Sequence, residues 1–515
     1  MKKRILSLVL ALVLCLSLAP AFTMEADAAT ANELLSQIPK DSLAYEVLTN
    51  CQYELDLGQW YTSVNDAAGK YGAGHLQGFC CDDEGKYFYA SFTNLLVKTD
   101  MKTGEIVGVV KGLAAGSISS GAHIGDICYY KGKIYGSLEY KAAKRWYICV
   151  FDGDKIEGLM NYTDPGVMYG LYVPQVGDDF INELTAGEHN NSESSMGHRY
   201  GTGGIDGITF GTLPGKGYDT DGDGDVDVPT GDERFMIVTY GPYGNAKRYD
   251  NENFVFLVYD FDNITEDNLI PFTEDLLTMD YTEEQKFFYE HKLFCYAGNQ
   301  TYGVQQLEFD EDSGDLLLEC YGRPSGTEFP GGSRYVIDGS IPLYLDTVEV
   351  GQSVTGDASG FVTQAAAHAT AAKYTDYEDG DGDGDKTEQE TGWHMTLKCI
   401  CANGKTMDEN HPATVYGKTG HACQVCVKNA QFSTGLRSLG NNLFYGSASG
   451  SGSDSGGAYQ WGKAYLYRLN RDTYTYEKIT EPAKLLASYT MDAADTYEQD
   501  GVVYMKDTSD RKSVV

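Results

Sequence analysis

Five short segments spread along the chain repeat one pattern of residues. Each has an aliphatic residue at its second position and an apolar residue at its fifth. They read HLQGF at 75–79, HIGDI at 123–127, GIDGI at 204–208, GVQQL at 303–307 and GLRSL at 435–439. Self-similarity at this scale indicates one supersecondary unit used several times, and it constrains the fold more strongly than any single element does.

Two further apolar runs follow each segment and repeat with it. The first run has the residue types of a short strand and contains one small residue, which is in turn Ser91, Ser137, Thr239, Cys320 and Ser447. The second run ends in a turn-forming residue, which is in turn Asp100, Asp152, Asp260, Asp338 and Asn470. A content of 60 glycines and 39 tyrosines also suits short, half-buried strands joined by tight turns.

Three or four short antiparallel strands, repeated with Gly and Asp turns, predict an all-β fold of the β-propeller type. Each blade buries its apolar faces only against its neighbours, so the ring has to close. We expect five recognisable blades within 75–480, after a lead-in at 29–74 with a short helix and strand, and before a strand or tail at 481–515. Strand-like pieces at 43–61 and 485–506 would build a sixth blade or complete the last one. A chain of two sandwiches is the alternative fold.

The first repeat resembles the blades of secreted bacterial propeller proteins. It reads DDEGKYFYASFTNLLVKTDMKTGEIVG at 82–108, with the Asp, Gly, Tyr, Ser, Leu, Asp and Thr-Gly of that blade pattern in order. The stretches GHRYGTGGIDGITFG and AGNQTYGVQQLEFDEDSGD look like parts of a secreted family of this kind. The resemblance implies the propeller fold and export, but it brings no catalytic motif with it.

The N-terminus has the pattern of a secretory signal peptide. A basic start precedes the apolar run ILSLVLALVLCLSLAPAF, and Ala26 and Ala28 offer a cleavage site. We therefore expect residues 1–28 to be removed and the protein to be secreted, extracellular or associated with the cell surface. No later run has the length of a membrane span, so none is expected after cleavage. An uncleaved membrane anchor is the alternative.

The chain is strongly acidic, with 39 Lys and Arg against 75 Asp and Glu and a formal net charge of −36. Binding of nucleic acid requires phosphate neutralisation by Lys and Arg, so a nucleic-acid partner is not expected. Anionic membrane surfaces are disfavoured for the same reason. The charge suits solubility outside the cell and hard cations as partners.

The innermost strand of each propeller blade runs along the central axis, so residues at its start converge from all blades. We expect the catalytic side chains to be His75, His123, His198, Tyr200 and Asp206. The expected substrate-binding side chains are Gln77, Arg199, Asn299, Tyr302, Gln305 and Arg437. These residues differ from blade to blade although the frame repeats, which favours a specific site over a repeated structural device.

Two kinds of site fit these residues. Imidazoles with Asp or Gln suit Zn²⁺ or another transition metal, which beside Arg199 and Tyr200 would polarise a substrate carboxylate while Tyr or His moves a proton. Without a metal, Arg199 and Arg437 would hold an acidic sugar on which aromatic rings stack. The structural alternative is an axis lined by polar groups that bond to one another and to buried water.

Long insertions are expected at about 160–203, 212–233, 265–290 and 345–430, and two of them contain stretches that predict Ca²⁺ sites. DGDGDGDKTEQE matches an EF-hand loop, with ligands expected at Asp379, Asp381, Asp383, Asp385, Thr387 and Glu390. DTDGDGDVD repeats the start of that loop, with ligands expected at Asp219, Asp221, Asp223, Asp225 and Asp227. Flanking amphipathic helices are missing from the first loop, and a solvated acidic loop is the alternative.

A small module rich in Cys and His lies in the last insertion. Its candidate metal ligands or disulfide partners are Cys399, Cys401, Cys423, Cys426, His411 and His421. Two close Cys pairs with histidines suit a tetrahedral zinc, although the first pair is C-x-C rather than C-x-x-C. Disulfides are equally natural in an exported protein, and free thiols are the third alternative.

These patterns together predict an exported, calcium-stabilised propeller that acts on an extracellular molecule at its axis. A glycan is the expected ligand, and an acidic one fits best, because tyrosines and convergent Arg, His and Asp suit sugars. As an enzyme the protein would be a lyase or a hydrolase. The alternative is a non-catalytic binding, adhesion or scaffold module, and the fold alone does not decide between them.

Overall fold

The computed structural model describes residues 34–57, 76–113, 122–181, 202–242, 253–296, 304–320, 333–349, 389–398, 428–429, 432, 435–447, 463–472, 474–480, 496–499 and 502–505. The expected signal peptide at 1–28 lies outside these residues. In this part of the chain, no helix has both the length and the apolar character needed to cross a bilayer.

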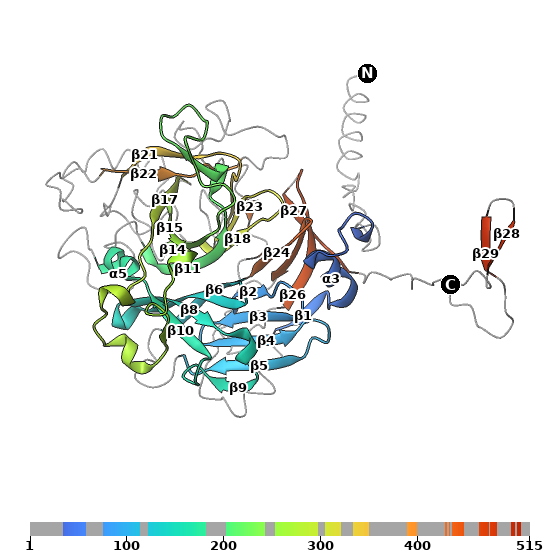
Figure 1. Cartoon of the computed structure of the whole chain (residues 1–515), viewed down its shortest axis with the longest axis horizontal. Helices are drawn as coiled ribbons and strands as arrows, with labels where there is room; N and C mark the ends of the chain where they lie inside the picture. The colour runs from blue at the N-terminus through green and yellow to red at the C-terminus, as the bar shows by residue number, and fades with distance from the viewer. Residues whose placement is uncertain are drawn as a thin grey trace, which may run out of the picture.

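Five sheets, each beginning with a strand at one of the repeated segments, form the main body of the described chain (Figure 1). Blade 1 contains β2 (Leu76–Cys81), β3 (Tyr87–Phe92), β4 (Leu95–Asp100) and β5 (Ile106–Lys111), with β9 (Gly158–Asn161) parallel to β5 at its edge. Blade 2 contains β6 (Ala122–Tyr130), β7 (Lys133–Tyr140), β8 (Arg145–Phe151), β10 (Met168–Tyr172) and β16 (Ile270–Pro271).

The third sheet is extended outward by strands from the insertions. Blade 3 contains β11 (Thr202–Gly211), β14 (Phe235–Pro242), β15 (Asn253–Asp260) and β17 (His291–Tyr296). Its extension contains β22 (Gln389–His394), β21 (Leu343–Glu349), β12 (Gly217–Asp219) and β13 (Val228–Pro229). Blade 4 contains β18 (Val304–Phe309), β19 (Leu316–Cys320), β20 (Ser333–Ile337) and β23 (Lys428–Asn429).

The last blade combines strands from both ends of the described chain. It contains β24 (Leu436–Gly440), β25 (Leu443–Ser447), β26 (Lys463–Asn470), β27 (Thr475–Lys478) and the N-terminal β1 (Glu54–Asp56). β1 pairs with the first half of β26, with Glu54 opposite Tyr465, and β27 pairs with the second half. The N-terminal lead-in therefore completes the last blade, whereas β28 (Thr496–Gln499) and β29 (Val502–Met505) pair only with each other.

The inner strands contact one another in a closed cycle. β2 contacts β6, β6 contacts β11, β11 contacts β18, β18 contacts β24, and β24 contacts β2 again. The described residues thus form a β-propeller with five blades, and the predicted fold is confirmed. The N-terminal strand β1 is hydrogen-bonded into the last blade, so one sheet holds strands from both ends of the described propeller.

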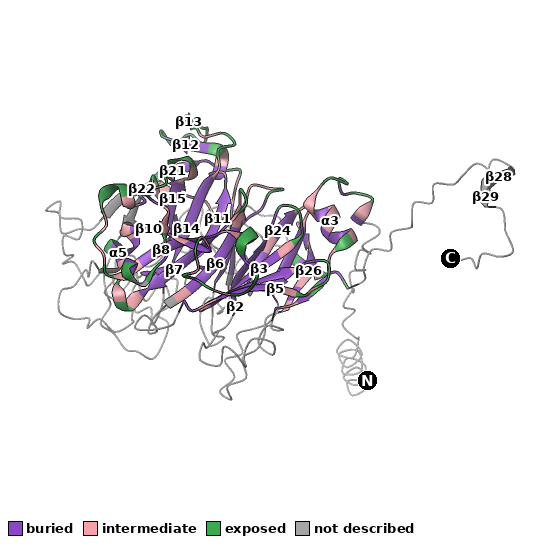
Figure 2. Cartoon of the chain, turned by 60° about the horizontal axis from the view of Figure 1, so that its bottom comes forward, coloured by how far each residue is buried: buried purple, intermediate pink, exposed green. Residues whose placement is uncertain are grey.

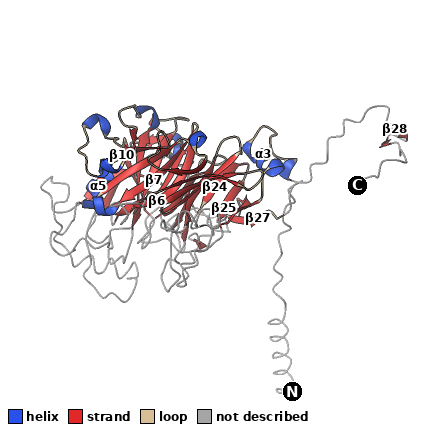
Figure 3. Ribbon diagram, turned by 90° about the horizontal axis from the view of Figure 1, so that it is seen from below, coloured by secondary structure: helices blue, strands red, loops and turns tan. Residues whose placement is uncertain are grey.

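Helices are few and lie at the periphery (Figure 3). α3 (Leu43–Asn50) begins at Ser42, whose hydroxyl accepts the Tyr45 N–H at 3.2 Å, and it contacts β24. α5 (Pro174–Ile181) contacts β8 and β11. The 3₁₀ turns are η2 (Lys141–Ala143), η3 (Gly153–Lys155), η5 (Pro214–Lys216), η6 (Phe261–Asn263), η7 (Glu274–Leu277) and η8 (Glu283–Gln285).

The hydrophobic core is divided among the seams between blades. In the described chain each of the five seams has its own cluster of buried apolar side chains. The cluster between blades 5 and 1 also takes in Val47 and Leu48 of α3. Figure 2 shows this burial as purple along the strands, with exposed residues mainly at turns and at β13.

Two of the small residues that recur in the second strand of the repeats join neighbouring blades, whereas Thr239 Oγ1 donates to the Val255 carbonyl within blade 3 at 3.1 Å. Ser91 Oγ in blade 1 donates to the Gly125 carbonyl of blade 2 at 2.8 Å. Ser137 Oγ in blade 2 donates to the Asp206 carbonyl of blade 3 at 3.0 Å. Each hydroxyl satisfies a buried carbonyl on the next inner strand, which is the physical reason for a small hydroxyl residue at these two positions.

Candidate functional site

Irregular pairing at the start of the inner strands turns polar side chains toward one another. The register shifts by one residue at Gln77 in β2, at Asp206 in β11 and at Gln305 in β18, and β6 is irregular over 124–127. A bulge of this kind bends the strand and re-aims a side chain. In β24 the pairing is regular at Arg437, and the shift comes after Ser438.

Glutamine side chains from non-adjacent blades meet at the axis. Gln305 Nε2 of blade 4 donates to Gln77 Oε1 of blade 1 at 3.0 Å, and Gln306 Nε2 donates to the Gln77 carbonyl. Gln77 Nε2 in turn donates to Thr93 Oγ1 at 3.2 Å. The structure thus brings Gln77 and Gln305 together, but as partners of each other in a buried amide chain.

A single buried carboxylate, that of Asp126, connects three blades. Asp126 Oδ1 accepts the N–H of Ile127 at 2.9 Å, and Oδ2 accepts those of Leu307 at 3.1 Å and Ile208 at 3.4 Å. A side chain at Gly78 would collide with Oδ1, so glycine is required there. Burial raises the pKa of Asp126 well above its usual range, although the three N–H groups oppose this. We assign this residue a structural role.

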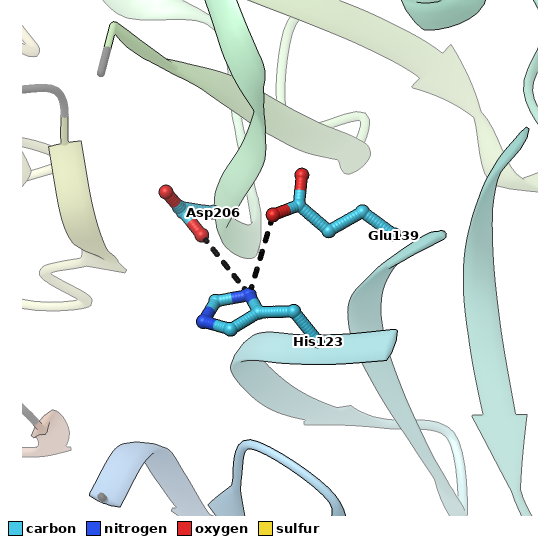
Figure 4. Close-up of side chains that lie close together, drawn as sticks. All are labelled: His123, Glu139 and Asp206. Atoms are coloured by element: carbon cyan, nitrogen blue, oxygen red, sulfur yellow. Dashed lines mark ion pairs between the residues drawn. The ribbon is translucent and has the colours of Figure 1, made fainter. Parts of the chain in front are cut away.

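One imidazole and two carboxylates form a second polar cluster in the seam between blades 2 and 3 (Figure 4). His123 Nδ1 lies 3.5 Å from Glu139 Oε1 and 3.7 Å from Asp206 Oδ1. Glu139 is directly opposite His123 in the β6–β7 hairpin, and Asp206 comes from the neighbouring blade. The His123 side chain is 25% exposed, against 4% for Glu139 and 11% for Asp206.

The charges in this cluster are unevenly balanced. Lys141 Nζ lies 3.1 Å from Glu139 Oε1. Burial raises the pKa of Glu139, while Lys141 and the Trp146 indole oppose the rise. Burial, with the Glu139 charge, raises the pKa of Asp206 to about 6. Two buried carboxylates therefore face one imidazole and one partly exposed ammonium.

Two glycines allow the backbone to approach these carboxylates. A side chain at Gly204 would collide with Glu139 Oε2, and the Gly204 φ of 131° is one that other residues rarely adopt. A side chain at Gly241 would collide with Asp206 Oδ2. The glycines that follow the His-Arg-Tyr stretch of the sequence thus include one that makes room for Glu139.

Arg437 lies away from the His123 cluster, against its own carboxylate. Its Nη1 donates to Glu308 Oε1 at 3.2 Å, and the Ser438 N–H donates to the same oxygen at 2.8 Å. Burial raises the pKa of Glu308 to about 7, with Arg437 opposing the rise. Because this guanidinium is buried and paired across the seam between blades 4 and 5, it is not arranged to bind substrate.

Several of the predicted site residues lie outside the described residues. These are His75, His198, Arg199, Tyr200, Asn299 and Tyr302. The same holds for the Cys and His module, with Cys399, Cys401, Cys423, Cys426, His411 and His421, and for Asp379, Asp381, Asp383, Asp385 and Thr387 of the first acidic loop. Glu390 falls within β22, which gives only its place in the backbone.

The second acidic loop is described, and three of its five predicted ligands come together. Donor oxygens of Asp219, Asp221 and Asp227 lie within 4.8 Å of one another. Asp219 is buried and accepts two backbone N–H groups of the loop at 2.6 and 2.8 Å. Asp223 and Asp225 are exposed and lie outside this group of three.

Glu139, Lys141 and Trp146 were not among the sequence-predicted site residues. The signal for Glu139 was present in the hairpin, because the two-residue turn at 131–132 joins β6 to β7 and sets which residues oppose each other. Counting back from that turn places His123 opposite residue 140, and the irregularity at 124–127 moves it to Glu139. That one-residue shift carried no signal in the sequence.

Fold and cluster together define a five-bladed β-propeller with an ionisable site between two blades. No protein-family model matches the chain, and a search of curated proteins finds no match. The chain is similar to PQQ-bound aldose sugar dehydrogenase from Streptomyces coelicolor, at 10% identity and a TM-score of 0.31, over 77% of this chain and 95% of that one. It is similar to Hsv2 from Kluyvelomyces marxianus, at 5% identity and a TM-score of 0.20, over 79% and 97%. Likenesses this weak carry no argument about activity.

Proposed function

We propose that this protein is an exported propeller that binds an extracellular, acidic glycan beside His123 and Asp206 and cleaves it. The convergence of His123, Glu139 and Asp206 carries the proposal. Ionisable side chains with perturbed pKa values, gathered from separate elements, are typical of chemical sites. Export rests on the N-terminal signal pattern and fits the formal net charge of −36.

Elimination suits the cluster better than hydrolysis does. Glycoside hydrolases need two carboxyl groups that both reach the sugar, about 5–5.5 Å apart in retaining and about 6.5–9.5 Å apart in inverting enzymes. The nearest donor oxygens of Glu139 and Asp206 lie within 4.8 Å, and Glu139 is buried beside Lys141 and Trp146. Glu139 is therefore not placed to attack or protonate a sugar, and we favour a lyase.

The lyase step makes specific demands on the site. A base takes the proton from C5 of a uronic acid unit, the C4–C5 double bond forms, the C4–O4 bond breaks, and the leaving oxygen takes up a proton. Positive charge beside the sugar carboxylate stabilises the charge that develops on it. His75, His198 and Tyr200 are the sequence-predicted groups for proton transfer.

A non-catalytic binding, adhesion or scaffold module is the second candidate. It is favoured by the amide chain at the axis, where Gln77, Gln305 and Gln306 are joined by hydrogen bonds. The structural role of Asp126, which accepts N–H groups of blades 3 and 4, also favours it. In that case the polar side chains of the inner strands hold blades together. Any ligand would then bind elsewhere on the propeller.

Incubation of the purified chain with uronate-rich and neutral polysaccharides tests the proposal. We expect ultraviolet absorbance from an unsaturated sugar with uronate-rich polymers alone, and a loss of rate of at least about 100-fold in Asp206→Asn. His291→Ala, which alters a partly buried histidine of β17, is the matched control and should retain activity. Glycan binding without cleavage would support the second candidate and contradict the first.

We also propose that Ca²⁺ binds the acidic loops, with Asp219, Asp221 and Asp227 in the described one. Saturating Ca²⁺ at about 100 times its Kd would add about 2.7 kcal/mol to the free energy of unfolding. Asp221→Ala should reduce that gain, and Asp262→Ala, at an exposed position, should leave it unchanged.

For the Cys and His module, zinc or a disulfide remains the prediction, and thiol counting by mass spectrometry separates the two.

A further inference from the structure

We propose that His123 Nδ1, Glu139 and Asp206 bind one divalent transition-metal ion in the seam between blades 2 and 3. The three side chains come from two strands of one blade and the inner strand of the next. All three donor atoms lie within 4.8 Å of one another, and the imidazole is the exposed member of the set. An ion bound here would join the two blades at the end of their inner strands.

The spacing of the donor atoms is the first argument. At 3.5 and 3.7 Å, the distances from His123 Nδ1 to the two carboxylates exceed the 2.7–3.2 Å of a hydrogen bond to nitrogen. Ligands held about 2.0–2.1 Å from one ion in tetrahedral geometry lie about 3.4 Å apart. The two distances from His123 Nδ1 are therefore longer than a hydrogen bond and close to the separation of two ligands around one ion.

The unmet polar capacity of Asp206 is the second argument. Its Oδ1 is buried and accepts no hydrogen bond from the described residues, although Asp206 is only 8% exposed. The buried carboxylate of Asp126, by contrast, accepts three N–H groups. A buried carboxylate oxygen is stable only when it is paired or coordinates a metal. The ionisable group that faces Asp206 Oδ1 is the His123 imidazole, 3.7 Å away.

The third argument is that the Lys141 ammonium already places a positive charge beside Glu139. This ammonium lies 3.1 Å from Glu139 Oε1, the same oxygen that faces His123. The Lys141 side chain is 35% exposed, whereas the side chains of Arg334 and Arg437, which pair with the buried Glu319 and Glu308, are 4% and 15% exposed. Because the Lys141 ammonium and a bound ion would share Glu139 Oε1, Lys141 competes with the ion for this carboxylate.

The donor set indicates which ions fit. One imidazole nitrogen and two carboxylates suit Zn²⁺ or Mn²⁺, which take such mixed ligands with water in the remaining positions. Ca²⁺ prefers six to eight oxygen ligands, whereas this cluster offers one imidazole nitrogen and two carboxylates. The two classes of cation would therefore occupy separate places on the propeller.

The metal site does not depend on the proposed function, but the role of the ion in binding a sugar rests on it. An anionic sugar would be repelled by Glu139 and Asp206 unless further positive charge lies between them and the sugar. A divalent ion supplies that charge and would polarise the sugar carboxylate. The substrate class that follows is a glycan whose carboxylate occupies a coordination position left open by the three protein ligands.

Titration of the chelator-treated full chain with Mn²⁺, in excess Ca²⁺, tests the inference. Ca²⁺ fills the acidic loops, and Mn²⁺ avoids the thiol module, which prefers Zn²⁺. We expect one Mn²⁺ equivalent in the wild type and in His291→Ala. Glu139→Gln should lower its affinity by more than the roughly 10- to 100-fold that loss of an outer-shell partner causes.

Lys141→Gln is the informative counterpart, because it removes the competing cation and keeps all three ligands. We expect it to raise the Mn²⁺ affinity about tenfold. Equal Mn²⁺ binding by the wild type and Glu139→Gln, with both folded by circular dichroism, would overturn the inference. Mn²⁺ binding without glycan cleavage would leave it standing and overturn the proposed function. Cleavage in the presence of chelator would support the proposed function and overturn the role of the ion in binding the sugar carboxylate.

Discussion

The seam between blades 4 and 5 and the seam between blades 2 and 3 both bury carboxylates, but they neutralise them differently. On the blade 4 face, Arg334 Nε donates to Glu319 Oε1 at 2.7 Å, and its guanidinium lies 4.6 Å from the Tyr476 ring of blade 5. Glu308 meets Arg437 across the same seam. The buried Asp310 beside them pairs with Arg471, and the buried Asp315 pairs with Lys398 at 2.6 Å, so each of these acids has a cation of its own within the protein.

In the seam between blades 2 and 3, no arginine among the described residues pairs with Glu139 or Asp206, although the buried Asp179 of α5 in this seam pairs with Lys292 of β17 at 2.9 Å. Glu139 and Asp206 face His123 beyond hydrogen-bond distance, and the nearest ammonium belongs to the partly exposed Lys141. Buried charge alone therefore does not indicate a functional site. What distinguishes the His123 cluster from the Arg334 and Arg437 pairs is that its one ammonium, on Lys141, is 35% exposed, against 4% and 15% for the two guanidinium side chains.

The largest expected effect is on the blade 4 face, where Arg334→Met would leave Glu319 buried without its partner. Removing one member of a buried pair costs about 3–5 kcal/mol of the free energy of unfolding. Urea unfolding of the wild type and the variant measures it. A loss below about 1 kcal/mol would show that this pair is not the internal, structural one that the comparison requires.

The next effect is the pH dependence that Glu319 confers. Burial raises its pKa to about 7, although Arg334 opposes the rise. Since this lies above the value in the unfolded chain, the folded protein binds the proton more tightly, and the stability gained is complete below about pH 4.5 and lost as the pH rises through 7. We expect about 3 kcal/mol of this loss to disappear in Glu319→Gln. Parallel pH profiles of unfolding for the two proteins would contradict it.

Asp206→Asn at the other seam should have the opposite character. In the presence of chelator it removes one of two buried carboxylates within 4.8 Å of each other. We therefore expect the free energy of unfolding to stay the same or to rise by up to about 1 kcal/mol. Chemical unfolding in chelator checks this, and a loss above about 2 kcal/mol would make Asp206 a structural residue like Glu319.

The smallest effect is expected for Lys141→Gln in chelator. A partly exposed ion pair contributes at most about 1 kcal/mol, so the variant should unfold almost as the wild type does. Thermal unfolding with and without Mn²⁺ measures both parts of the expectation. The stabilisation by Mn²⁺ should be greater in the variant. An unchanged stabilisation would show that Lys141 does not compete with the ion for Glu139.

Much of the fold follows from the sequence, because the repeated segments mark the inner strands. The aliphatic second position has to face a seam in every blade, so the frame survives despite insertions of different length. The closure of the ring was left open, since the strand at Glu54–Asp56 is short and its partner β26 lies some 400 residues away in sequence. Such a pairing leaves no local pattern.

The site was only partly predictable for a related reason. His123 and Asp206 lie in two of the five repeated segments, and the propeller brings these two segments together. Glu139 lies on the second strand, and a one-residue irregularity at 124–127 decides that it opposes His123. Arg437 shares the frame with Asp206, yet β24 pairs regularly there and its side chain reaches Glu308 instead. Backbone irregularities therefore decided what the pattern could not.

Anomalous diffraction from crystals grown with Mn²⁺ and excess Ca²⁺ would locate the transition-metal ion itself. We expect a Mn²⁺ peak between blades 2 and 3, about 2.0–2.2 Å from His123 Nδ1 and from one oxygen each of Glu139 and Asp206. Density confined to the acidic loops, with His123 hydrogen-bonded directly to a carboxylate, would contradict it.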